Sequence, residues 1–222
     1  MNTPQAHCRQ CGTCCRKGGP ALHRQDLELV RQGYIGYQQL TTIRKGEPVY
    51  SPASGLLEAA ERELVKIMGR GRDWTCSFFV SETSACGIYA HRPLECRLLK
   101  CWDTADLLEV VGRETIQRRD LLNPGDPVLA LMDLHESQCP AEAVAAAVAQ
   151  WQRAQKDPAC RAALSDLVRR DLTVRHQALA RQGLPPAVEF FVFGRPLFKQ
   201  LGGFGITVRE TAGTVQLQWP EE

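Results

Sequence analysis

Apolar residues recur at helical spacing through two long segments in the second half of the chain. The pattern predicts one helix over about 140–156 and a second over about 158–182. Each segment begins with a proline, which is favoured in the first turn of a helix, and Gly183 follows the second, where it favours a helix end. The apolar face of the first helix carries Val144, Val148 and Trp151. Both segments are therefore expected to be amphipathic helices that pack on a core.

Apolar residues alternate with polar ones near the end of the chain. The alternating positions are Ile206, Val208, Val215, Leu217 and Trp219. Alternation of this kind puts one face of a strand against a core, and the interruption at 211–213 supplies a turn. We expect a small antiparallel hairpin there.

The first half of the chain shows shorter and less regular patterns. A short helix is predicted over 26–32, closed by Gly33, and a longer helix is predicted to end at Gly69. The apolar positions of the longer helix are Leu56, Leu57, Ala60, Leu64 and Ile67. The segment 43–54 holds turn residues without a sustained period and is expected to be a loop. Helical spacing returns over 102–120.

These patterns predict an α+β fold that is mainly α. We expect an irregular N-terminal half, helices in the C-terminal half and one small antiparallel hairpin. The chain has 222 residues, of which 44% are hydrophobic, enough for one medium domain or two small ones. We predict a first domain over 1–139 and a helical extension over 140–222 that packs on it.

Charge and hydropathy exclude some classes of protein. The net charge is +2 and the isoelectric point about 8.1, which is below the basic excess of typical nucleic-acid-binding domains. We therefore expect no nucleic acid among the partners. No apolar run approaches the ~18 residues of a membrane-spanning helix, and residues 1–7 lack a secretory pattern. The expected location is the cytoplasm, with no membrane partner.

The chain has ten cysteines, which are candidates for metal binding or redox chemistry. In a reducing compartment most would be thiols, which indicates metal binding or redox chemistry. A first group consists of Cys8, Cys11, Cys14 and Cys15. Two residues separate each of the first three, a spacing that lets a tight turn aim successive sulfurs at one ion or cluster. Because neighbouring side chains usually point apart, Cys14 and Cys15 are expected to serve two metals or the two sides of one cluster.

A second group, at wider spacing, consists of Cys76, Cys86, Cys96 and Cys101. The two groups together supply eight thiolates, enough for two tetrahedral zinc sites or for an iron–sulfur cluster with sulfurs to spare. Cys139 is a candidate ninth ligand. His91 and His135 are the histidines nearest to cysteines, and a hydrogen-bonded or surface role is the simpler expectation for both. Cys160, within a predicted helix, is expected to be a core residue. We expect metal to organise the cysteine-rich N-terminal half.

Basic residues flank the cysteines, where each would either stabilise the thiolate form or serve as an ordinary solvated surface charge. They are Arg9, Arg16, Lys17, Arg92, Arg97 and Lys100. The Arg92-Pro93 pair is expected to turn the chain between Cys86 and Cys96, while the guanidinium hydrogen-bonds a sulfur or a carbonyl oxygen.

Two cysteine motifs carry a resemblance to a known family. They are Cys8-x2-Cys11-Gly12-x-Cys14-Cys15 and Cys86-x-Ile88-Tyr89-x2-Arg92-Pro93-x2-Cys96-Arg97, the second followed by Cys101. Together they resemble the YkgJ-type cysteine-cluster family of CxxCxxCC proteins. The resemblance covers about residues 8–101 and extends more weakly to Cys139-Pro140. It implies a metal-chelating domain with zinc or iron as its ligand.

Two other functions compete with chelation. One is an iron–sulfur-dependent redox or protein-modifying enzyme, because the family also resembles the cysteine-rich part of bacterial flagellin lysine N-methylases. The first three cysteines match the opening of a ferredoxin-type run, with Cys139-Pro140 as a distant partner, but Gly18 stands where the fourth cysteine is due. The chain also has no glycine-rich nucleotide signature, so the methylase activity is not carried over. The other function is a structural zinc platform that binds a macromolecule. Whether the protein is an enzyme, and which protein it binds, stay open at this stage.

Overall fold

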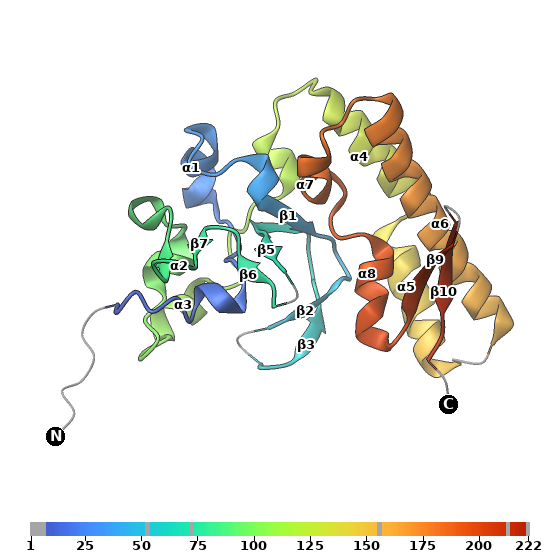
Figure 1. Ribbon diagram of the computed structural model, residues 1–222, viewed down its shortest axis with the longest axis horizontal. Coiled ribbons are helices and arrows are strands. Elements are labelled where there is room, and N and C mark those ends of the chain that lie inside the picture. Colours follow the sequence, from blue (N-terminus) through green and yellow to red (C-terminus); the bar gives the residue numbers. More distant parts are fainter. Residues whose placement is uncertain (1–7, 52–53, 72, 155–156, 212–213, 221–222) are drawn as a thin grey trace.

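The computed structural model describes residues 8–51, 54–71, 73–154, 157–211 and 214–220. Short helices and small strand pairs form the cysteine-rich part of the chain, and longer helices form most of the remainder (Figure 1). Among the described residues, helices account for 48% and strands for 16%, which confirms an α+β fold that is mainly α. Within the ranges given above, no helix is both long and apolar enough to cross a membrane.

The strands form two-stranded antiparallel pairs. The pairs are β1 (Leu40–Ile43) with β4 (Leu64–Ile67), β2 (Pro48–Tyr50) with β3 (Leu57–Ala59), β5 (Gly69–Arg70) with β6 (Thr75–Cys76), β7 (Phe79–Val80) with β8 (Ala85–Cys86), and β9 (Thr207–Thr211) with β10 (Thr214–Gln218). The segment after the first cysteine group runs along β4. The Leu22 amide donates to the Val65 carbonyl at 2.8 Å, and the Ile67 amide donates to the Pro20 carbonyl at 2.9 Å.

The helix predicted to end at Gly69 is wrong, because β3 and β4 occupy that segment. Leu64 and Ile67 are three residues apart, as on one face of a helix, but the strand pairs with β1 and sets Leu40 opposite Ile67. This pairing satisfies the backbone of both strands and overrides the local preference. The loop predicted over 43–54 is also wrong at its centre, where β2 lies.

Short helices fill the rest of the N-terminal half. They are η1 (Cys15–Lys17), η2 (Arg24–Asp26), α1 (Leu27–Arg31), η3 (Tyr37–Gln39), η4 (Tyr89–His91), α2 (Leu94–Leu98), α3 (Ala105–Val110) and η5 (Arg118–Leu121). The first α-helix confirms the helix predicted over 26–32, and Gly33 follows it with a φ of +77°. The helical spacing over 102–120 corresponds to α3 and η5 with an irregular link between them.

Longer helices form the C-terminal half. Helices α5 (Ala141–Arg153) and α6 (Pro158–Arg181) confirm the two predicted helices, and β9 and β10 confirm the hairpin. The Asp157 side chain caps α6 by accepting a hydrogen bond from the Ala159 amide at 2.9 Å. Elements that the pattern did not predict are α4 (Pro127–Gln138), η6 (Pro186–Val188), α7 (Glu189–Phe193), α8 (Leu197–Leu201) and η7 (Gly202–Phe204).

Two apolar cores stabilise the fold. The first includes Leu22, Leu40, Val65, Ile67, Ile116, Met132, Val174, Phe191 and Phe193. The second includes Trp151, Cys160, Leu164, Leu201 and Ile206, so Cys160 is a core residue as expected. The first core draws on both sides of the boundary predicted after residue 139, and a division into two domains there stays a prediction.

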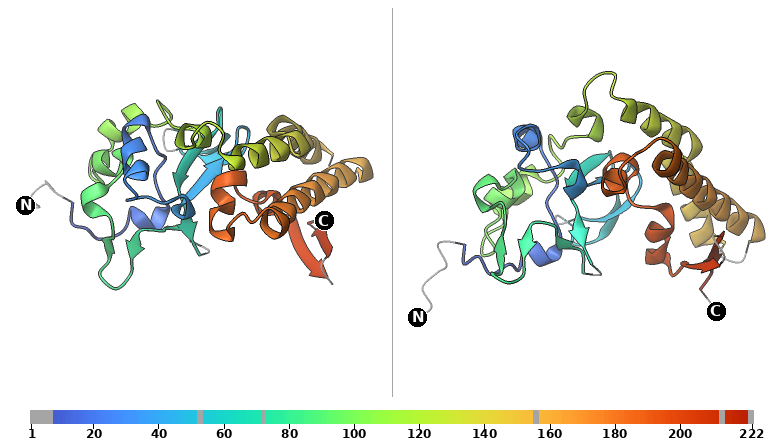
Figure 2. Two further views of the ribbon diagram at one scale, coloured as in Figure 1. Left: turned by 90° about the horizontal axis from the view of Figure 1, so that it is seen from above. Right: turned by 45° about the horizontal axis from the view of Figure 1, so that its top comes forward.

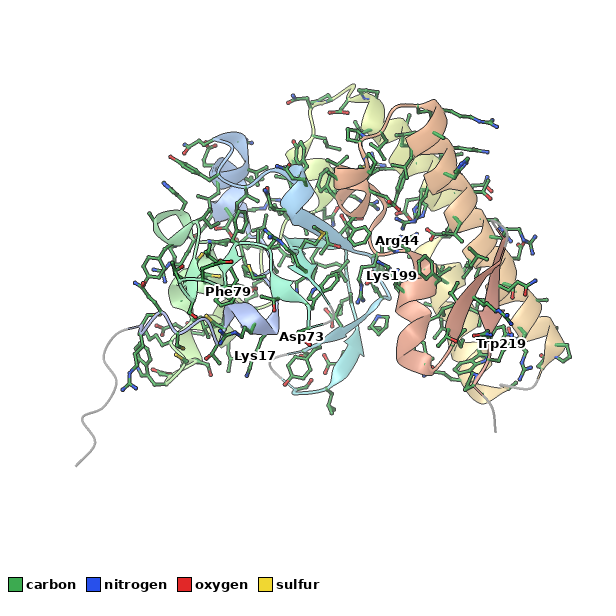
Figure 3. All side chains as sticks on the ribbon, viewed as in Figure 1. Lys17, Arg44, Asp73, Phe79, Lys199 and Trp219 are labelled. Carbon is green, nitrogen blue, oxygen red and sulfur yellow. The ribbon has the colours of Figure 1, made fainter. Side chains whose placement is uncertain are left out.

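Buried arginines join the two halves of the molecule. Arg44 lies between the cysteine-rich part and the C-terminal helices (Figure 3), and its Nη2 donates to Glu136 at 2.8 Å. Arg118 contacts the same carboxylate and also donates to Glu63 at 2.8 Å. Figure 2 shows from two further directions that the C-terminal helices lie to one side of the cysteine-rich part. These ion pairs help to fix that arrangement, because a buried charge is costly without its partner.

Candidate metal centre

The first cysteine group lies on a tight turn that a glycine allows. Gly12 has a φ of +73°, in the left-handed region that favours glycine. A Cβ at this position would lie 2.3 Å from Cε2 of Phe79 and 3.3 Å from the Ser84 carbonyl oxygen. The Arg16 amide donates to the Gly12 carbonyl at 3.0 Å and closes the turn. The turn therefore packs directly on the β7–β8 hairpin, where Figure 3 labels Phe79.

The sulfurs of Cys14 and Cys15 lie 4.0 Å apart. The expectation that these neighbouring side chains point away from each other is therefore wrong. In a tetrahedral site with Zn–S bonds of about 2.3 Å, two sulfurs lie roughly 3.8 Å apart, so one ion could take both. The hydrogen bond between the two thiols lowers the pKa of Cys14 to about 6 and raises the pKa of Cys15. A lowered pKa favours the thiolate of Cys14, which is the form that binds metal.

Strands β6 and β8 bring two thiols of the second group to this turn. The η1 helix, which begins at Cys15, packs against β6 and hence against Cys76. Cys86 is opposite Phe79 in the β7–β8 register, and the Phe79 ring is the group that Gly12 faces. Burial raises the pKa of Cys76, and the neighbouring thiols of Cys86 and Cys14 raise it further.

Helix α2 adds Cys96 to these thiols. Burial raises the pKa of Cys96, and the nearby thiols of Cys76, Cys14 and Cys86 add to this effect. We refer to Cys14, Cys15, Cys76, Cys86 and Cys96 as the five-cysteine group. Its members come from the N-terminal turn, β6, β8 and α2, and each is near enough to another to influence its ionisation.

Three further predicted ligands, Cys8, Cys11 and Cys101, lie outside the five-cysteine group, and Cys11 is near enough to Cys14 to be influenced by it. Cys11 is exposed, and a contact of 3.2 Å with the Thr13 hydroxyl lowers its pKa, while nearby Cys14 has the opposite effect. Cys8 is half-buried and accepts a hydrogen bond from the Gln10 amide at 3.4 Å. Cys101 is exposed and follows α2.

One family model matches the cysteine-rich part of the chain. The model of the CxxCxxCC family, described as "Putative zinc- or iron-chelating domain", matches residues 7–117. The chain belongs to the CxxCxxCC family. The match spans both cysteine motifs and thereby confirms the resemblance seen in the sequence. No curated protein and no solved structure matches the chain.

The thiols of the CxxCxxCC domain are neighbours and not yet a formed coordination shell. Throughout the part of the chain that the structure describes, no three His, Cys, Asp or Glu side chains are already placed to hold one ion. The donor set itself fits zinc and iron, because both metals bind cysteine thiolates. Closing a site would involve rotation of side chains within the five-cysteine group.

Cys139 lies beyond the residues that match the CxxCxxCC family and apart from the five-cysteine group. It is fully buried between α4 and α6, with its sulfur 3.6 Å from the Leu167 carbonyl oxygen. Burial raises its pKa to about 11, and the other groups that influence it are Asp171 and three arginines. His135, four residues earlier, is hydrogen-bonded through Nε2 to Asp171 at 2.7 Å.

Arg92, which belongs to the second cysteine motif, influences the ionisation of Cys14 through its charge. Nε of Arg92 donates to the Tyr89 carbonyl oxygen at 2.9 Å, one of the two contacts expected for it, and the guanidinium lies 3.7 Å from the centroid of the Tyr89 ring. Its positive charge adds to the effect of Cys15 in lowering the pKa of Cys14. His91 stacks on Tyr34 with ring centroids 3.5 Å apart.

Two carboxylates that the sequence analysis missed, the half-buried Glu95 and the buried Asp26, connect the chain after the N-terminal turn to α2. Oε2 of Glu95 accepts from the Ala21 amide at 3.0 Å, and Oε1 lies 3.2 Å from Nε2 of His23. Asp26 accepts from the His23 amide at 2.9 Å and from the Leu94 amide at 2.8 Å. The hydrogen bond that the Glu95 carboxylate accepts from His23 raises the pKa of His23, and burial raises the pKa of Asp26.

The sequence did hold a local signal for each carboxylate. Asp26 stands three residues after His23, at the spacing of a capping box, in which a side chain bonds back to the backbone at the start of a helical turn. Glu95 directly precedes a predicted ligand, Cys96. Neither signal names the distant partner, which only the fold brings near.

Proposed function

We propose that the protein chelates zinc or iron through the five-cysteine group, with Cys8, Cys11 and Cys101 as further thiolate donors. The observation that supports the proposal is that five thiols from four separated segments of the chain lie near enough to influence one another's ionisation. Cysteines that serve only as small apolar residues have no reason to gather in this way. Four sulfurs are enough to close a tetrahedral zinc site.

Charge near the centre supports this proposal. Thiolates around a divalent ion leave a net negative charge, which neighbouring cations offset. Arg92 already favours the thiolate of Cys14, and the Arg16 guanidinium lies over the Phe79 ring, 5.0 Å from its centroid, beside the turn. Because the ligands must lose protons, binding is expected to weaken at low pH.

The exposure of some of the proposed ligands favours a metal ion that can exchange over a structural ion that is deeply buried. Cys11 and Cys14 are exposed, whereas Cys76 is buried. A metal bound across these thiols would have one side within reach of an incoming ligand. Such a site suits storage or transfer of the metal.

The alternative of an iron–sulfur enzyme gains no specific support. It relied on Cys139-Pro140 as a distant partner of the first cysteines, and Cys139 is buried against α6, where Asp171 and arginines are its charged neighbours. Chelation therefore remains the single function that we propose, with the identity of the metal left to measurement.

The test begins with the full chain produced in medium that contains both zinc and iron and purified without oxygen. Zinc, iron and sulfide are then measured per chain. Colourless protein with bound zinc indicates a thiolate zinc site, and brown protein with iron and sulfide indicates an iron–sulfur cluster. Protein that retains neither zinc nor iron after this purification contradicts the proposal.

Two variants locate the site. The double variant Cys76→Ser, Cys96→Ser should lose most of the metal, since it removes two members of the five-cysteine group. The control is Cys160→Ser, which changes a buried thiol of the second core and should retain the metal. Equal metal content in both variants and the wild type would refute this ligand set.

A further inference from the structure

We propose that Glu95 and Asp26 are positioning residues of the metal centre, which hold Cys96 near the N-terminal turn before a metal ion binds. The inference rests on the proposed chelating function and adds two residues that are not themselves offered as ligands. It concerns α2, the helix that carries Cys96.

Helix α2 has five residues, so it depends on contacts with the rest of the protein. Isolated helices of this length are unstable in water, because the first turn costs more conformational entropy than its hydrogen bonds return. The Leu94 amide, in the first turn, has no acceptor within the helix. Oδ1 of Asp26 accepts its hydrogen bond at 2.8 Å, and the Asp26 side chain is fully buried. Asp26 thus caps α2 from a segment far away in the sequence.

Glu95 attaches the same helix to the chain that leaves the first cysteine group. Its two oxygens contact the Ala21 amide and the His23 ring, across 74 and 72 residues of sequence. Ala21 lies six residues after Cys15 and forms a bridge with Lys66 of β4. The carboxylate therefore fixes α2 relative to both the turn and a strand of the first core.

These contacts connect the two cysteine groups without using a thiol. Cys96 directly follows Glu95, so a shift of the carboxylate shifts the sulfur. Groups that orient metal ligands in this way typically change metal affinity by roughly 10–100-fold when they are replaced. A purely structural contact of equal strength elsewhere would reduce stability but leave the affinity of the folded protein unchanged.

The chain offers a closely matched control in Glu63. One oxygen of Glu63 accepts from the Arg118 amide at 3.0 Å, and the other accepts from the Arg118 guanidinium. The side chains of Glu63 and Glu95 are 19% and 16% exposed, so the two carboxylates are similarly buried. Glu63 is attached to η5, whereas Glu95 is attached to the chain next to the cysteine turn. The substitutions E95Q and E63Q therefore remove comparable contacts at different places.

The experiment titrates cobalt(II) into metal-free, reduced full-length protein against a competing chelator. The wild type, E95Q, Asp26→Asn and E63Q are compared, with circular dichroism to establish that each is folded. We expect E95Q and Asp26→Asn to bind cobalt roughly 10–100-fold more weakly and E63Q to bind like the wild type. Should E95Q not fold, Asp26→Asn decides the outcome. Wild-type affinity in the folded E95Q variant, or an equal loss in E63Q, overturns the inference.

A second measurement needs no metal. Iodoacetamide labelling of Cys96, followed by mass spectrometry of the metal-free proteins, should be faster in E95Q than in the wild type and unchanged in E63Q. Equal labelling of Cys96 in the wild type and E95Q also overturns the inference. A wild-type protein that binds neither cobalt nor zinc would instead refute the proposed chelating function, and faster labelling in E95Q would still support the positioning role.

Discussion

Thr42 on β1 and Phe191 on α7 are joined by a hydrogen bond of 2.6 Å across 149 residues of sequence. The Thr42 hydroxyl donates to the Phe191 carbonyl oxygen, and both side chains are buried. The contact links a strand of the cysteine-rich half to a helix of the C-terminal half. The same helix packs against β1 in the first core. The two halves therefore depend on each other for their packing.

Replacing Thr42 with valine should lower the free energy of unfolding by about 1–2 kcal/mol, because the buried Phe191 carbonyl loses its donor. Urea unfolding followed by circular dichroism measures the change. The control is Thr173→Val, which removes an exposed hydroxyl that donates to the Arg169 carbonyl within α6. An equal effect of the two substitutions would show that the link between β1 and α7 contributes no more than a surface contact.

Replacing Gly12 with alanine should destabilise the N-terminal turn and weaken metal binding. A left-handed φ costs a residue with a side chain roughly 1–2 kcal/mol, and here the new Cβ would also overlap the Phe79 ring. Gly33→Ala is the control, because Gly33 has a similar φ of +77° but no atom within 4 Å of a Cβ built there. Thermal unfolding and zinc content of the two variants are compared. If Gly33→Ala loses as much metal as Gly12→Ala, the contact with Phe79 is not the cause.

Acidification should destabilise the protein through His135. Burial lowers the pKa of this histidine, and the positive charges of Arg44 and Arg175 lower it further. Its hydrogen bond to Asp171 acts in the opposite direction. The unfolded chain then binds a proton more readily than the folded protein, so stability falls as the pH drops below about 6.5, by up to about 1.4 kcal/mol per pH unit. Urea unfolding between pH 5 and 7.5 should show this dependence in the wild type and less of it in His135→Gln.

His23 should change the pH dependence of stability in the direction opposite to His135. Its hydrogen bond to Glu95 raises its pKa, so the folded protein retains this proton longer than the unfolded chain. The resulting stabilisation is complete below about pH 6.5 and is lost as the pH rises through the folded pKa. Relative to His23→Gln, the wild type should therefore lose stability from pH 6.5 upward. Parallel pH profiles of the His23 and His135 variants would contradict both assignments.

Removing the metal should loosen the N-terminal turn and leave both cores folded. The first core is built mainly from apolar residues such as Leu22, Leu40 and Phe191, which need no metal to pack. Hydrogen–deuterium exchange of chelator-treated protein should rise most over 8–18, less over α2, where Asp26 and Glu95 hold the helix, and least over α6. A loss of protection along the whole chain would show instead that the metal is required for the fold.

Local pattern determined the elements whose signals lie within a few residues. Helices α5 and α6 follow from apolar spacing between proline and glycine signals, and the β9–β10 hairpin follows from alternation. The cysteine spacing likewise determined the family, because the two motifs are short and carry their own glycines and prolines. In each case the atoms that decide the outcome are close in the sequence.

Tertiary structure decided what depends on distant partners. The segment 64–67 has helical spacing but is a strand because β1, more than twenty residues earlier, pairs with it. No spacing indicates that Cys15 meets Cys76, that Cys139 lies apart, or that Glu95 bonds to His23. Burial and hydrogen bonding between remote segments determine these positions, and their free energies appear only when the chain is folded. For this reason the sequence indicated the thiols that we propose as metal ligands, while the fold decided which of them lie near one another.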